Sequence, residues 1–148
     1  MDFRRATPHD VQAIETLLAD AGLPLDGAAA AFDLGIVGRT GPDGRVVAAA
    51  AIERFADNGL LRSVVVAHDH RGTGVGRSLV TAAEDLAAEA GIHDLWLLTE
   101  TAVDWFPRLG YQVVERTAAA AAVGESVEFT TICRDTGVPM HRSVGVAR

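Results

Sequence analysis

The spacing of apolar residues changes period several times along the chain and predicts an alternation of strands and helices. Residues 8–21 place apolar side chains at helical intervals between Thr7, a capping residue, and Gly22, which ends the helix. A second amphipathic helix is predicted from a glycine-rich loop at 72–76 to about Ala90. Period-two and continuous apolar runs predict strands at 2–6, 34–39, 45–55, 60–66, 95–99, 111–115 and 138–146, with turns at 41–44 and 57–59.

Two short helices are predicted at 103–109 and 118–122, and the pattern of segment 126–133 is ambiguous. No repeat, low-complexity linker or proline-rich stretch divides the 148 residues. This length is usual for one domain, and it is long enough to bury a core without disulfides. We therefore expect a single α/β domain over residues 1–148.

Composition narrows the functional classes. The net charge of −7, without a basic run, argues against a nucleic-acid partner, and the longest apolar runs are too short to cross a membrane. No signal peptide or lipidation motif follows Met1, so a cytoplasmic location is expected. Cys133 is the single cysteine, and no Cys/His cluster has the spacing of a zinc site, so no metal is expected. All 13 basic residues are arginines, which suit phosphate and carboxylate recognition.

Candidate chemistry is concentrated between Leu61 and Arg77. An apolar strand is followed by Arg71, by glycines at 72, 74 and 76, and by the amphipathic helix. Glycines let the backbone approach a ligand closely, and a helix N-terminus carries a partial positive charge. The segment therefore predicts a pyrophosphate site between a strand and a helix.

Three other interpretations explain this loop less well. A Walker loop needs a lysine after its last glycine, and the chain has none. A dinucleotide fingerprint needs G-x-G-x-x-G in an N-terminal unit, whereas the spacing here is G-x-G-x-G in mid-chain. A tight turn without a ligand explains one glycine but hardly three beside an arginine.

The loop resembles the coenzyme A loop of the GNAT superfamily of N-acetyltransferases, whose pattern Arg/Gln-x-x-Gly-x-Gly/Ala is filled by Arg71, Gly74 and Gly76. The similarity continues into Leu95-Trp96-Leu97-Leu98-Thr99 and Trp105-Phe106-Pro107-Arg108-Leu109-Gly110-Tyr111, so that it covers residues 60–115. The resemblance implies one GNAT-like domain with a central mixed, mostly antiparallel, twisted sheet flanked by helices. The central strands at 60–66 and 95–99 would splay apart to admit the thioester.

The same resemblance implies acetyl-CoA as co-substrate. The backbone of Val64 and Val66 would pair with the pantetheine arm, and the loop N–H groups would hold the pyrophosphate. The implied cofactor-binding residues are Val64, Val66, Arg71, Gly72, Thr73, Gly74, Val75, Gly76 and Arg77.

Shorter matches resemble the small acetyltransferases encoded with arsenic-resistance genes. They are Ala21-Gly22-Leu23-Pro24, Asn58-Gly59-Leu60-Leu61-Arg62-Ser63 and Ser126-x-Glu128-Phe129-x-x-Ile132-Cys133. Related enzymes acetylate the amine of glutamate-like toxins such as phosphinothricin or arsinothricin. This resemblance implies detoxification of a small amine by direct transfer in a ternary complex.

Acyl transfer to an amine needs a base, a donor to the thioester oxygen and a proton for the leaving thiolate. Glu53 is the candidate base, with a merely solvated glutamate as the alternative, and the family implies the Val64 N–H as the oxygen donor. Many family members have a tyrosine where this chain has Phe106. The thiolate would then be protonated by water, by Ser126 or by Cys133, since core packing explains Tyr111 better.

Substrate binding is assigned to Arg62, Thr101 and Ser126. Arg62 could form a bidentate pair with a substrate carboxylate, and an ordinary surface ion pair is the alternative. Thr101, with Glu100, replaces an asparagine common in the family. Two other functions remain open, namely a non-catalytic acyl-CoA-binding regulatory module and a protein or peptide N-acetyltransferase. Exposed sheet edges and the C-terminal strand would also permit a homodimer.

Overall fold

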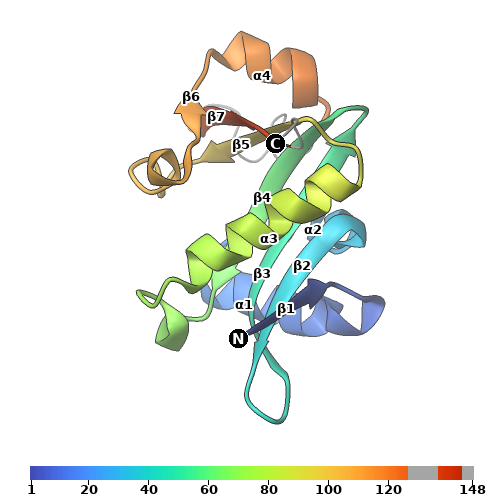
Figure 1. Ribbon diagram of the computed structural model, residues 1–148, viewed down its shortest axis with the longest axis vertical. Coiled ribbons are helices and arrows are strands. Elements are labelled where there is room, and N and C mark those ends of the chain that lie inside the picture. The colour runs from blue at the N-terminus through green and yellow to red at the C-terminus, as the bar shows by residue number, and fades with distance from the viewer. Residues whose placement is uncertain (127–136, 145–148) are drawn as a thin grey trace. The chain divides into compact units, whose positions relative to one another are not determined.

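The computed structural model describes residues 1–126 and 137–144, so that Cys133 and most of the ambiguous segment 126–133 lie outside the described residues. Its strands are β1 (Asp2–Arg5), β2 (Gly35–Thr40), β3 (Arg45–Phe55), β4 (Asn58–Val66), β5 (Asp94–Thr99), β6 (Gln112–Val113) and β7 (Val138–Ser143) (Figure 1). Its α-helices are α1 (Val11–Asp20), α2 (Ala28–Ala31), α3 (Val75–Glu89) and α4 (Arg116–Val123). Short 3-10 helices are η1 (Pro8–Asp10), η2 (Phe32–Leu34), η3 (His68–His70) and η4 (Phe106–Leu109).

The strands form one sheet in the order β1-β2-β3-β4-β5-β7-β6. The pairs β1–β2, β2–β3, β5–β7 and β6–β7 are antiparallel, whereas β4 and β5 pair in parallel. The parallel register joins Asn58–Leu60 to Asp94–Trp96. The predicted mixed, mostly antiparallel sheet with helices is therefore confirmed.

The chain forms two compact units. The first comprises Met1–Ile52 and Ser63–Leu86, and the second comprises Glu53–Arg62 and Ala87–Arg148. Strands β3 and β4 contribute residues to both units.

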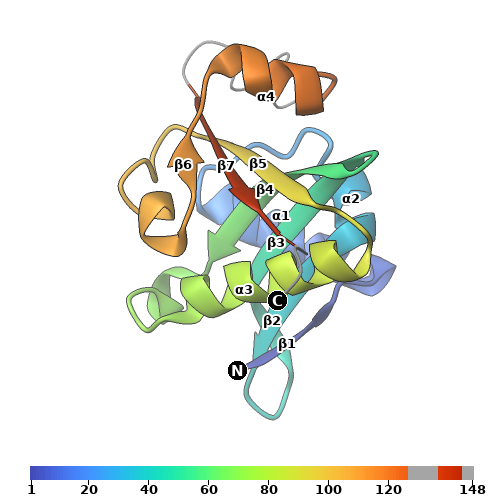
Figure 2. The same cartoon turned by 45° about the horizontal axis from the view of Figure 1, so that its top comes forward.

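In the first unit, α1 and α2 cover one face of the strands and α3 crosses the other (Figures 1 and 2). The buried side of α1 is formed by Ile14 and Leu18, as its apolar period predicts. These side chains join a core of Ala6, Ala28, Ala31, Phe32, Val37, Ala49, Ala51 and Val65. The strand side of this core consists of small side chains, Val37, Ala49, Ala51 and Val65, so the helices can lie close to the sheet.

The start of α1 is fixed by an ion pair between residues of β1 and η1, which no local sequence pattern predicts. Arg4 donates from both terminal nitrogens to Asp10, at 2.8 and 2.9 Å, and the Thr7 N–H donates to the same carboxylate at 2.8 Å. The hydrogen bond from Arg4 is the largest cause that lowers the pKa of Asp10 to about 2. The strand β1 and the first helix are thereby joined by a buried carboxylate.

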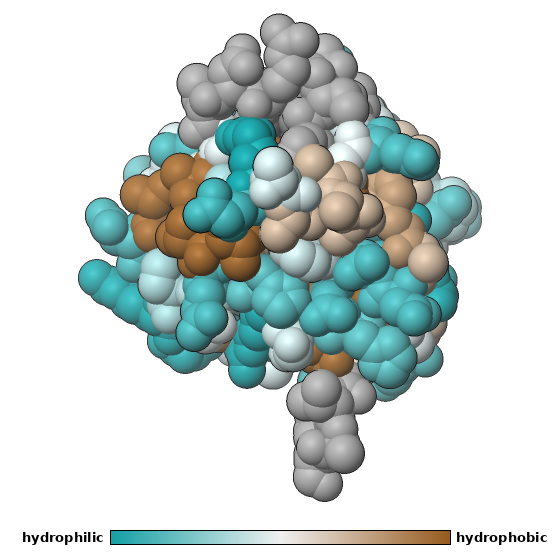
Figure 3. Space-filling model, turned by 90° about the horizontal axis from the view of Figure 1, so that it is seen from above, coloured by the Kyte–Doolittle hydropathy of each residue, from teal (hydrophilic) through white to brown (hydrophobic). Residues whose placement is uncertain are grey.

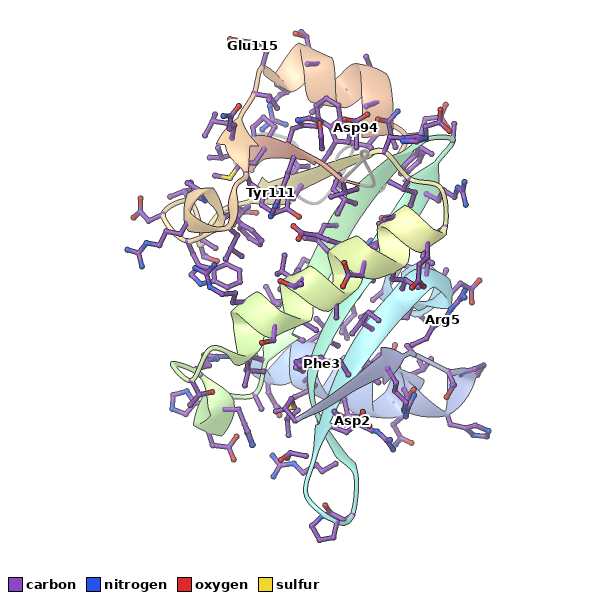
Figure 4. The ribbon with its side chains drawn as sticks, in the orientation of Figure 1. Asp2, Phe3, Arg5, Asp94, Tyr111 and Glu115 are labelled. Carbon is purple, nitrogen blue, oxygen red and sulfur yellow. The ribbon has the colours of Figure 1, made fainter. Side chains whose placement is uncertain are left out.

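In the second unit, α4 packs beside β5 and β7 (Figure 2). Ala119 and Val123 of α4 form a buried cluster with Leu60 and Leu98, so the alanine run 118–122 is helical as predicted. On β5, the Asp94 carboxylate, labelled in Figure 4, lies 2.7 Å from His141 Nε2 of β7. These contacts join the short parallel pairing of β4 with β5 to the antiparallel pairing of β5 with β7.

The predicted turn at Asp57-Asn58-Gly59 is wrong by two residues. The turn comprises Ala56 and Asp57, with Ala56 at φ 57°, and β4 already begins at Asn58. Asn58 is held in the strand because its backbone pairs with β5 and its side-chain oxygen accepts a hydrogen bond from Trp96 Nε1 at 2.9 Å. Tertiary pairing therefore overrides the local turn preference of Asn-Gly.

Other boundaries differ in detail. The predicted strand 111–115 is reduced to β6, and the predicted helix 103–109 is a 3-10 helix over Phe106–Leu109. Strand β7 ends at Ser143, and residues 145 and 146 of the predicted strand lie outside the described residues. The helices α2 and η2 were not predicted. Gly110, at φ 97°, ends η4 as expected, because glycine tolerates the left-handed conformation.

The face drawn in Figure 3 is mainly hydrophilic, and its hydrophobic residues are gathered in limited areas. Within residues 1–126 and 137–144, the exposed large hydrophobic side chains are Met1, Leu25, Val103 and Val113. None of the described helices has the length and apolar content needed to cross a bilayer.

Candidate active site

The loop between β4 and α3 is built as the sequence predicts. After η3, the chain turns through Gly72 and Gly74, which have φ values of 78° and 83°, and α3 begins at Val75. The Thr73 hydroxyl donates to the His70 carbonyl at 2.8 Å, and the Ser78 N–H donates to the Gly74 carbonyl at 3.2 Å. Both glycines adopt a conformation that other residues rarely adopt, so the backbone of this loop requires glycine at these two positions.

The loop also leaves space for a ligand. A Cβ atom placed on Gly72 or Gly74 would have no neighbouring atom within 4 Å, and both glycines are exposed. The first N–H groups of a helix lack partners within the helix, and those of a 15-residue helix add a favourable dipole. Residues Val75, Gly76 and Arg77 occupy this first turn of α3. The backbone here therefore fits an anionic group such as a pyrophosphate.

Arg71 folds back toward the end of β4. Its Nε donates to the Val66 carbonyl at 3.0 Å, and its side chain is exposed. One hydrogen bond from the guanidinium thus fixes the loop to the strand. The contacts of Arg71 and Val66 with a coenzyme remain predictions.

Strand β4 carries a local irregularity just before Val64. Ser63 has φ 56°, in the left-handed region that non-glycine residues seldom adopt, and such conformations often occur at functional sites. An irregular residue inside a strand reorients the neighbouring peptide groups. The Val64 N–H, predicted to donate to the thioester oxygen, directly follows this residue.

The second unit brings together three of the predicted site residues. Glu53 Oε1 accepts a hydrogen bond from Arg62 Nη1 at 3.0 Å and another from Ser126 Oγ at 2.8 Å. The Arg62 side chain is fully buried, so the ion pair is an internal one rather than the surface pair considered as an alternative. Glu53 is therefore more than a solvated glutamate, because it is the acceptor of a buried polar cluster. We call Glu53, Arg62 and Ser126 the carboxylate cluster.

In the part of the chain that the structure describes, Thr101 makes no hydrogen bond to this cluster. It is exposed in the loop after β5, where the preceding Thr99 side chain accepts a hydrogen bond from the Ala102 N–H at 3.0 Å. Its role in substrate binding remains a prediction.

The aromatic residues after β5 form a stacked group. The ring centroid of Phe106 lies 4.9 Å from that of Trp105 and 5.6 Å from that of Tyr111, both in edge-to-face geometry. Tyr111, labelled in Figure 4, is buried. This packing agrees with the structural role expected for Tyr111. The Phe106 ring is held between the rings of Trp105 and Tyr111.

No cluster of three or more His, Cys, Asp or Glu side chains suited to a metal occurs in the part of the chain that the structure describes. The contact between Ser126 and Glu53 was missed by sequence reasoning, because 73 positions separate them and no local pattern links them. The 53–62 contact could have been suspected, since both residues flank a short hairpin turn. The glycine loop lies in the first unit and the carboxylate cluster in the second.

The chain is similar to known proteins in sequence and in fold. The family model of the acetyltransferase (GNAT) domain matches residues 36–113, more than half of the chain. An amino-acid acetyltransferase of Pasteurella multocida is 35% identical over 75 residues, which are 49% of this chain and 17% of that protein. The chain thus spans about a sixth of the length of that curated relative.

Two solved structures share the fold. The N-acetylglutamate synthase from Neisseria gonorrhoeae, complexed with coenzyme A and N-acetyl-glutamate, has a TM-score of 0.80 and 20% identity, over 97% of this chain and 35% of its own. Rv2747 from Mycobacterium tuberculosis, in complex with CoA, has a TM-score of 0.77 and 22% identity, over 97% and 99% of the two chains.

Proposed function

This chain belongs to the family of acetyltransferase (GNAT) domains, and from that premise we propose that it transfers an acetyl group from acetyl-CoA to the amine of a small molecule. The observation that carries the proposal is the exposed glycine loop at the start of α3, inside the family match. Its backbone conformation and its helix N-terminus suit the pyrophosphate of coenzyme A. The loop residues Gly72 to Arg77 would hold this group.

The transfer is direct within a ternary complex. The amine nitrogen attacks the thioester carbonyl carbon, the new N–C bond forms, and the C–S bond breaks. Glu53 accepts the proton that the amine loses, while the Val64 N–H donates to the oxygen that gains negative charge. The leaving thiolate takes up one proton, so the products are an amide and free coenzyme A thiol.

For the acceptor we propose a glutamate-like amino acid, including toxins of the phosphinothricin or arsinothricin type. The amino-acid acetyltransferase relative and the N-acetyl-glutamate complex of the structural neighbour support a small amino-acid acceptor. The three short motifs that resemble those of acetyltransferases of arsenic-resistance operons support the toxin class. A cytoplasmic location would suit such a role.

The proposal is tested by following release of free thiol from acetyl-CoA with a panel of amines. The panel contains glutamate-like toxins, ordinary amino acids, polyamines and peptides, and acetyl-CoA binding is measured in parallel by calorimetry. Turnover with glutamate-like amines alone supports the full proposal. Turnover with peptides alone would replace the small-molecule acceptor, and binding without turnover on any amine would favour a non-catalytic acyl-CoA sensor.

A further inference from the structure

The carboxylate of Glu53 is held by donors that come from two distant parts of the chain. Arg62 lies on β4, across the hairpin turn from Glu53 on β3, whereas Ser126 follows α4. Both donors bond to the same oxygen, Oε1, at 3.0 and 2.8 Å. Among the described residues, the side chain is therefore fixed through Oε1, and none of them donates to Oε2.

Burial differs sharply within the carboxylate cluster. The Arg62 side chain is 0% exposed and Ser126 is 1% exposed, whereas 22% of the Glu53 side chain remains exposed. The two donors lie inside the protein, and the carboxylate is the member that a ligand or solvent can reach. This pattern of burial suits a carboxylate that keeps one oxygen accessible while its hydrogen-bond donors stay fixed.

The charges of the cluster argue against Arg62 as the anchor for a substrate carboxylate. A buried guanidinium needs an opposite charge, and Glu53 already supplies it. A substrate carboxylate would have to displace Glu53 or share a guanidinium that has no exposed surface. The Arg62 guanidinium therefore pairs with a carboxylate of the protein itself.

A general base works best when its lone pair is held toward the proton that it abstracts. Hydrogen bonds from Arg62 and Ser126 restrict rotation of the Glu53 carboxylate. Resting on the proposed acetyl transfer, we propose that Arg62 and Ser126 are positioning residues, which orient Glu53 so that Oε2 accepts the proton of the amine. They act through Glu53 rather than by binding the substrate.

The mildest test is Ser126→Ala, which removes one hydrogen bond to the carboxylate and leaves the ion pair in place. Hydrogen bonds to charged groups correspond to about a tenfold change or more. We expect kcat to fall about tenfold, with KM for the amine changed less than about twofold. The matched control is Ser143→Ala. Ser143 is the exposed last residue of β7, its hydroxyl donates to Asp94 at 3.4 Å, and its removal should leave kcat unchanged. A rise in KM for the amine at constant kcat would assign Ser126 to substrate binding and overturn the proposal.

A double-mutant cycle tests whether the effect passes through Glu53. In a Glu53→Gln background, Ser126→Ala should lower the residual kcat by less than about twofold, because the oriented base is already absent. Independent, multiplicative losses would show that Ser126 acts elsewhere. Arg62→Lys, which keeps the charge, should retain more kcat than Arg62→Met at comparable thermal unfolding temperatures, and equal losses would count against positioning by Arg62.

The two proposals fail in different ways. If the unsubstituted protein binds acetyl-CoA but acetylates no amine, the transferase function and the positioning role both fall. If it acetylates an amine and the Ser126 and Glu53 effects multiply, the transferase function stands and only the positioning role falls. Thermal unfolding of every variant separates loss of kcat from loss of the folded state.

Discussion

Substitution of Gly74 by alanine tests the cofactor loop most directly. Gly74 has φ 83°, and the left-handed region costs an L-residue about 1–2 kcal/mol. The added Cβ would meet no atom within 4 Å, so the substitution introduces backbone strain without a clash. Because the loop is exposed, we expect the strained backbone to relax locally, and binding of acetyl-CoA must then restore the original conformation.

The magnitude follows from this strain. If acetyl-CoA binding has to recover about 1–2 kcal/mol, the dissociation constant rises about 5- to 30-fold, since 1.4 kcal/mol corresponds to a factor of ten. The thermal unfolding temperature should change little, because few contacts depend on the relaxed loop. Isothermal titration calorimetry with acetyl-CoA and a thermal unfolding curve measure the two quantities on the same sample.

Gly22→Ala is a matched control. Gly22 has φ 71° and likewise no atom within 4 Å of an added Cβ, but it ends α1, where its N–H bonds to Ala19 and Leu23 bonds back to Leu18. The same strain in Gly22→Ala should lower the thermal unfolding temperature by about 2–4 °C per kcal/mol for a chain of this size. The affinity for acetyl-CoA should be unchanged. If Gly74→Ala binds acetyl-CoA as tightly as the unsubstituted protein, the loop does not hold the pyrophosphate and the proposed function loses its main support.

Three further predictions concern other parts of the chain. The Asp10 carboxylate has a pKa of about 2 in the folded protein against 3.8 in the unfolded chain, so it should contribute about 2 kcal/mol to the free energy of unfolding above pH 4. This contribution is lost as the pH falls toward 2, and chemical unfolding at pH 7 and pH 2.5 measures the loss. If Asp10→Asn lowers the free energy of unfolding equally at both pH values, the prediction is refuted. Gly38→Val should lower the free energy of unfolding by about 1–3 kcal/mol, because even a Cβ would lie 2.9 Å from the Phe3 ring. Denaturant titration should show that Phe3→Leu in the same chain restores part of this stability. Glu53→Gln should lower kcat about 10²- to 10⁴-fold with acetyl-CoA affinity retained, and an unchanged pH–rate profile would remove Glu53 from the mechanism.

The elements that sequence reasoning located well are those with a strong local signal. Helix α3 has an apolar face over two helical turns and more, a glycine loop before it and Gly91 after it, so both ends were within a residue or two of the prediction. The strand β3 matches its predicted bounds, because a long apolar run stands between two turns. In these segments, local propensity and tertiary packing favour the same conformation.

The misplaced elements are those whose conformation depends on distant residues. Helix α2 is a single turn of four alanines after Gly27, too short to show a helical period, and it is stabilised by burial of Ala28 and Ala31 in the core around Phe32. The Asn58-Gly59 pair favours a turn locally but forms the start of β4, since β5 supplies a partner for its backbone and Trp96 a donor for its side chain. A single-sequence pattern contains neither partner.

The candidate site divides along the same line. The part proposed to bind phosphate is a local motif, because consecutive residues supply the glycines, the N–H groups and the helix start, and so it can be found from spacing alone. The part proposed to accept the proton is not local, because Glu53 is bonded to Ser126, which folding brings from beyond the end of α4. The sequence shows that Arg62 is charged but not that its side chain is buried. Burial determines whether the guanidinium can reach a substrate or pairs with Glu53 inside the protein. The proposed role of Arg62 in positioning Glu53 therefore depends on tertiary structure. If Arg62 has that role, specificity for an acidic acceptor must come from other donors.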